Sequence, residues 1–207
     1  MGKSKIPGKN DLPAKGKDPR EQLFEVLKRV FSEIPSSDEP LSAEPCERAR
    51  SIVTKASLGA ATTSGILAIP PGPVGIATII PDLFAIWKIQ AKMVADIAGA
   101  YGKKDKLSPE QMLLCLFKHS AAQVVRDLAV RVGERVLIKR ASLRVMQRTM
   151  KALVPRITQR VIGRSVSRWL PVVGVVGVAG YAYYDTAQVG KTAIDLFANE
   201  VVIESGR

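Results

Sequence analysis

The chain has 207 residues, 46% of them hydrophobic and 5% aromatic, so it can bury the core of one fair-sized domain. Lys and Arg exceed Asp and Glu by 31 minus 19, a net charge of +12, which favours an anionic partner such as an acidic membrane surface or a nucleic acid. Cys46 and Cys115 are far apart, which excludes a disulfide scaffold and a zinc ribbon and favours a reducing compartment.

Residues 1–17 are rich in Lys, Gly and Pro, so we expect a disordered basic tail. No apolar run follows the first basic residues, so no secretory signal is predicted, and Ile6 stands where myristoylation requires Ser or Thr. We expect a helix and a linker over 18–45, with Asp18 as N-cap, Pro19 in the first turn and an end at Pro35. Its predicted apolar face consists of Leu23, Val26, Leu27, Val30 and Ile34.

The stretch from Ala56 to Pro81 contains no charged residue. It is interrupted by a turn-forming cluster, Pro70, Pro71, Gly72 and Pro73. We therefore predict a helix from about Cys46 to near Ile69, a tight turn, and an antiparallel amphipathic helix from Pro81 to Tyr101. Each apolar half is shorter than the roughly 20 residues that span a membrane. Two alternatives stay open: a buried hairpin that also engages the membrane, and the core of a soluble bundle.

The second half of the chain also reads as helical. Gly102 is a predicted C-terminal cap, and Ser108, Pro109 and Gln111 form a predicted capping box. A helical pattern then reaches Val154, where Pro155 is expected to interrupt it, and a shorter helix continues to Trp169.

Pro171 opens the last segment, in which Gly174, Gly177 and Gly180 recur among apolar residues before a helix over 181–199. We predict an all-α fold, a multi-helix bundle with an apolar Pro/Gly-turned hairpin and this second Gly-rich apolar segment.

Three passages together resemble the EcsC family of bacterial proteins: GILAIPPGPVGIATIIPDLFAIWKIQAKMVADIAGAYG, LCLFKHSAAQ and RWLPVVGVVGVAGYAYYDTAQVGKTA. The resemblance covers roughly residues 47–198, and we take 46–200 as an EcsC-like helical domain. It implies an all-helical, membrane-associated protein, in a family named for its association with a transporter operon. It implies no catalytic residue, and none is predicted here.

Between residues 131 and 168 there are eleven basic residues and one acid, Glu134. Ten of the basic residues follow helical spacing: Arg131, Arg135, Lys139, Arg140, Arg144, Arg148, Arg156, Arg160, Arg164 and Arg168. Like charges one turn apart destabilise a lone helix, so we expect a partner to offset them. An anionic lipid surface is the leading interpretation, and a solvated face is the main alternative. Nucleic acid is the weaker partner, since no aromatic residue lies in this segment to stack on bases.

Three carboxylates lie in apolar helical surroundings: Asp82, Asp96 and Asp185. Asp82 suits the first turn of a helix, while Asp96 and Asp185 are predicted to form polar contacts between the two apolar segments. His119 and Cys115 share a helix face, but two such side chains do not make a metal site, so no metal is predicted. Gly190-Lys191-Thr192 ends like a phosphate-binding loop, yet Asp185 stands where that motif requires glycine, so no cofactor is predicted either.

The sequence therefore predicts a non-catalytic helical adaptor on the cytoplasmic face of a membrane, bound to anionic lipid through the basic residues. A membrane transporter or another protein is a further expected partner. Two alternatives remain: an enzyme that acts on a lipid or another anionic substrate with a buried carboxylate, and a soluble nucleic-acid-binding bundle.

Overall fold

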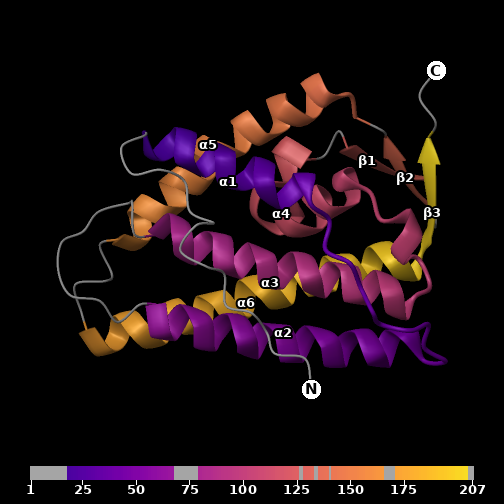
Figure 1. Ribbon diagram of the computed structural model, residues 1–207, viewed down its shortest axis with the longest axis horizontal. Helices are drawn as coiled ribbons and strands as arrows, with labels where there is room; N and C mark the ends of the chain where they lie inside the picture. The colour runs from indigo at the N-terminus through magenta and orange to yellow at the C-terminus, as the bar shows by residue number, and fades with distance from the viewer. Residues whose placement is uncertain are drawn as a thin grey trace.

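The structure, a computed structural model, describes residues 18–67, 79–125, 128–132, 135–139, 141–165 and 171–204 (Figure 1). Six helices make up most of this part of the chain, so the predicted multi-helix bundle is confirmed. They are α1 (Pro19–Ser32), α2 (Pro45–Leu67), α3 (Ile79–Ala100), α4 (Pro109–Val125), α5 (Leu143–Ser165) and α6 (Pro171–Ala198), with the 3-10 turn η3 (Lys104–Lys106) before α4.

The predicted helix ends are largely confirmed by capping contacts. The backbone N–H of Arg20 donates to the Asp18 carboxylate over 2.9 Å, so α1 begins where expected, although it ends at Ser32 rather than Pro35. At the start of α4, the backbone N–H of Ser108 donates to the Gln111 side chain over 2.8 Å, which is half of the capping box. Gly102 has a φ of +65° and ends α3 in a Schellman motif.

Helices α2, α3 and α6 form the long central part of the bundle. The chain turns back between α2 and α3, so these helices lie side by side in opposite directions, as predicted for the hairpin (Figure 1). The turn itself, Pro70, Pro71, Gly72 and Pro73, lies outside the described residues. α2 packs most extensively against α6, where a Cβ on Gly190 would lie 2.3 Å from Cγ2 of Val53. Gly190 is therefore a site of close helix packing.

Continuous helix between Pro109 and Val154 was predicted, and this is wrong. α4 has a non-helical residue at Ala121 and ends at Val125, and two strands follow: β1 (Ala129–Val132) and β2 (Arg135–Lys139). These strands pair antiparallel, with Val132 opposite Arg135. Short runs rich in Val, Leu and Ile suit a strand as well as a helix, and a Gly between the two runs favours a hairpin.

A third strand, β3 (Glu200–Glu204), pairs in parallel with β2 and completes a small sheet in the order β1-β2-β3. Ile138 of β2 is fully buried and belongs to the hydrophobic core. The sheet lies at one end of the molecule, at the right of Figure 1.

Pro155 was predicted to interrupt the helix, and this is wrong. It lies within α5 and is exposed. A proline inside a helix removes one backbone hydrogen bond and costs about 3 kcal/mol. The apolar side of α5 continues past it, with Leu153 fully buried and Ile157 packed against the core. Packing on this side favours a single helix across the proline.

The end of the molecule opposite the sheet collects several helix ends. α2 and α5 end there, and α3 and α6 begin there, at the left of Figure 1. The two apolar segments of the sequence therefore meet at one end of the bundle.

Candidate functional site: the basic helix α5 and the polar core network

α5 begins after Ser142, whose hydroxyl accepts a hydrogen bond from the backbone N–H of Val145 over 3.4 Å. Its buried side includes Met146, Met150 and Leu153, which belong to the core. The opposite side is exposed and carries Arg144, Arg148, Lys151 and Arg156. The sequence of α5 contains six basic residues and no acid. The helix therefore presents positive charge to solvent with no acid of its own to neutralise it.

The basic side chains of α5 differ in their acidic neighbours on other elements. Among the described residues, Arg144, Arg148 and Arg156 form no ion pair with any acid. Lys151 differs, because it lines a cleft of about 510 Å³ that also contains Glu21 and Glu25 of α1. None of these four basic side chains forms an ion pair among the described residues, but Lys151 alone shares a cleft with acids.

The structure divides the predicted basic series among different elements. Arg131, Arg135 and Lys139 lie on β1 and β2, so their predicted helical spacing on one face is wrong. Arg144, Arg148 and Arg156 are exposed on α5. Arg160 and Arg164 lie in its last turns, where the backbone alone is described, and Arg140 and Arg168 lie outside the described residues. Of the single basic surface that was predicted, only the part on α5 is described as exposed.

Asp185 of α6 forms the centre of a polar network inside the bundle. Its Oδ1 accepts from Nε2 of His119 in α4 over 2.9 Å and from the hydroxyl of Tyr181 over 2.7 Å. Its Oδ2 accepts from Nε2 of Gln90 in α3 over 2.9 Å. Nε2 of Gln90 also lies 3.2 Å from the hydroxyl of Thr186, and both of these residues are fully buried. One carboxylate thus connects α3, α4 and α6.

Hydrogen-bond donors stabilise the charged form of Asp185. Burial alone would raise the pKa of Asp185, but hydrogen bonds from His119, Tyr181 and Gln90 outweigh it and lower the pKa below the ordinary 3.8. Because a carboxylate can only accept, the His119 proton must lie on Nε2. Nδ1 of His119 is buried and has no hydrogen-bond partner among the described residues. In this arrangement the pair links α4 to α6.

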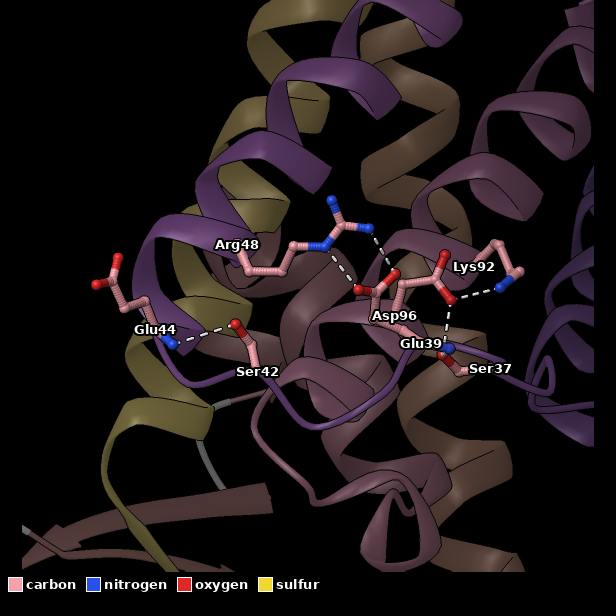
Figure 2. A network of polar contacts seen from close by, with 7 residues as sticks. All are labelled: Ser37, Glu39, Ser42, Glu44, Arg48, Lys92 and Asp96. Atoms are coloured by element: carbon pink, nitrogen blue, oxygen red, sulfur yellow. Dashed lines mark hydrogen bonds and ion pairs between the residues drawn. The ribbon is translucent and has the colours of Figure 1, made fainter.

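Asp96 belongs to a second network, shown in Figure 2, that ties the linker before α2 to α3. Its Oδ1 accepts from the hydroxyl of Ser37 over 2.7 Å and forms an ion pair with Lys92. In the same linker Glu39 accepts two hydrogen bonds from Arg48 of α2, over 2.6 and 2.9 Å. These hydrogen bonds lower the pKa of Glu39. Asp96 therefore holds the linker, whereas a contact with the second apolar segment had been predicted.

Neither network was fully predicted from the sequence. Asp185 and His119 were both singled out, but as separate residues, because they lie 66 positions apart. Asp82 is half-buried in the first turn of α3, the position predicted for it. Cys115 is fully buried in the core, which raises the pKa of its thiol to about 12. Among the described residues no three His, Cys, Asp or Glu side chains converge as a metal site would require.

Within the described part of the chain, no helix is both long enough and apolar enough to cross a membrane. The chain matches no protein-family model, no curated protein and no solved structure.

Proposed function

We propose that this protein is a non-catalytic helical adaptor that binds reversibly to an anionic membrane surface through the basic helix α5. The observation that carries the proposal is the charge of α5: six basic residues, no acid, and exposed Arg144, Arg148 and Arg156 without ion-pair partners among the described residues. Each basic side chain near an anionic lipid surface contributes about 1 kcal/mol of attraction. Lipid phosphates would supply ion-pair partners for Arg144, Arg148 and Arg156, which have none among the described residues.

The resemblance to the EcsC family supports the same class of function, since it implies helical proteins associated with membranes. A protein partner in the membrane, such as a transporter, is part of this proposal. The face of the membrane that fits it is the cytoplasmic one, where anionic lipids attract basic segments.

Binding to vesicles tests the proposal directly. Two variants each remove two charges from α5, Arg144→Gln with Arg148→Gln in its first half and Arg156→Gln with Arg160→Gln in its second half. The matched control replaces Lys104 and Lys106 of η3, which are also exposed, by Gln. We expect at least one α5 variant to bind anionic vesicles about tenfold more weakly, while the control binds as the parent does.

Three results would contradict the proposal. The parent protein could fail to bind anionic vesicles at low salt, it could bind neutral and anionic vesicles equally, or the control could lose as much binding as both α5 variants. In the last case the net charge of +12 would act without any contribution particular to α5.

A further inference from the structure

Among the described residues, α2 and α6 expose a surface without charge at one end of the bundle. α2 carries no charged residue from Ala56 to its end at Leu67, and α6 carries none from Pro171 to Tyr184. Large side chains are nevertheless exposed in both stretches: Leu58 is 55% exposed, Val176 69% and Tyr184 59%. We call these two stretches the uncharged end.

The two stretches lie at the same end of the molecule. Gly190 of α6 contacts Val53 of α2, and the two helices run in opposite directions (Figure 1). Leu67 follows Val53 by fourteen positions, and Val176 precedes Gly190 by fourteen, so each lies about 21 Å along its helix from this contact. Val176 is thus level with the end of α2, at the left of Figure 1.

On α2, α3 and α5 the first charges that the structure describes as exposed beyond this end are positive, whereas α1, which also begins on this side of the molecule, exposes both basic and acidic residues (Figure 1). These first charges are Lys55 on α2, Lys88 on α3 and Arg156 on α5. On α6 the first charged residue is Asp185, which is engaged in the core network. The one acid nearer the end on these helices, Asp82, is half-buried. We call Lys55, Lys88 and Arg156 the basic border.

We propose that the tip of the uncharged end inserts shallowly into the interface of an anionic bilayer, with the basic border behind it facing the lipid headgroups. This inference rests on the proposed function. It adds an orientation of the molecule on the membrane, with this end of the bundle facing the bilayer. An apolar surface with basic residues behind it on three helices matches the layers of a bilayer leaflet, and tyrosines favour the boundary between them.

A fluorescent label reports whether the uncharged end enters the bilayer. Cys46→Ser removes the exposed thiol, while Cys115 is buried with a pKa of about 12 and stays unlabelled. An environment-sensitive dye is then attached at Val176→Cys or, as the control, at Leu41→Cys. Leu41 is 70% exposed and lies beside Gly102, towards the opposite end. With vesicles containing anionic lipid, we expect the dye at 176 to shift to the blue and to be quenched by shallow spin-labelled lipids, and the dye at 41 to stay unchanged.

A second pair of variants separates insertion from charge. Val176→Glu and Leu41→Glu each add one negative charge at a well-exposed position, so both are expected to fold. We expect Val176→Glu to bind anionic vesicles about tenfold more weakly than Leu41→Glu.

The outcomes distinguish this inference from the proposed function. If the parent protein does not bind anionic vesicles, both are wrong. If it binds while the dye at 176 remains in water and the two Glu variants bind equally, the proposed function stands and the insertion is wrong. The insertion is also wrong if the dye at 176 shifts with rising protein concentration in the absence of vesicles, because the uncharged end would then bind a second copy of the chain.

Discussion

At the scale of single residues, Asp185 shows how a charged side chain is accommodated in an apolar bundle. Its carboxylate is largely buried, yet His119, Tyr181 and Gln90 donate hydrogen bonds to it from three helices. Hydrogen bonds to a charged group contribute about 1.5–3 kcal/mol each in favourable cases, and a buried group that loses them has a high free energy. Asp185 is therefore expected to fix how α3, α4 and α6 pack.

Replacing Asp185 by Asn tests this role. An amide accepts at one oxygen only, so we expect the free energy of unfolding to fall by about 1–3 kcal/mol and the melting temperature to fall with it. Asp105→Asn in the exposed η3 is the control and should leave the melting temperature unchanged. The pKa of folded Asp185 is lowered, so its stabilisation is present above the ordinary 3.8 and is lost as the pH falls through the folded value. The Asn variant should therefore lose less stability than the parent below pH 3.8.

The same variant addresses the enzyme alternative. A structural Asp185 predicts that stability falls while any measurable hydrolysis of lipid or another anionic substrate changes only a few-fold. Loss of such an activity with an unchanged melting temperature would instead make the His119–Asp185 pair a catalytic site.

At the scale of helices and strands, the sequence predicted elements whose ends carry local signals. The capping residues Asp18, Ser108 and Gly102 satisfy backbone groups within a few positions, so their effect is visible in the sequence. Strands β1 and β2 were not predicted because short apolar runs such as AVRV and RVLIK fit a helix as well as a strand. The parallel partner of β2 is β3, more than sixty residues away, and no local pattern indicates such a pairing.

The contact between α2 and α6 gives a sharp test at this scale. A methyl group on Gly190 would lie 2.3 and 2.7 Å from the two Cγ atoms of Val53, so Gly190→Ala must push the helices apart. We expect the free energy of unfolding to fall by about 1–3 kcal/mol, measured by urea denaturation. Gly180→Ala on the same helix has open space around its Cβ and should raise stability by up to about 1 kcal/mol, because alanine favours helix.

A compensating change checks the cause. Val53→Ala removes the two methyl groups that the new Cβ would meet, so it should restore part of the stability lost in Gly190→Ala. If Gly190→Ala is as stable as the parent, or if Val53→Ala adds its own loss in full, the contact does not limit the packing of the two helices.

At the scale of the whole molecule, charge and apolar surface are distributed unevenly. The sequence showed both the excess of basic residues and the two uncharged segments. It could not show that α2 and α6 bring these segments to one end, because that depends on contacts such as Val53 with Gly190, which are 137 positions apart. The same reason hides the networks around Asp185 and Asp96, whose partners come from distant parts of the chain. The sequence thus indicated which single residues are charged or apolar, but it did not indicate which of them lie together in the fold.

This distribution predicts how salt separates lipid from nucleic acid as partners. A net charge of +12 attracts any polyanion, but attraction between exposed charges weakens as the screening length falls from about 10 Å at 0.1 M salt to about 3 Å at 1 M. Insertion of an uncharged surface is not screened. We therefore expect binding to a DNA duplex to be lost between about 0.1 and 0.5 M salt, while part of the binding to anionic vesicles persists. Vesicle sedimentation in the presence of competing duplex measures both. A parallel loss of the two would show that charge alone holds the protein to lipid, and a duplex that displaced it from vesicles at every salt concentration would favour the nucleic-acid alternative.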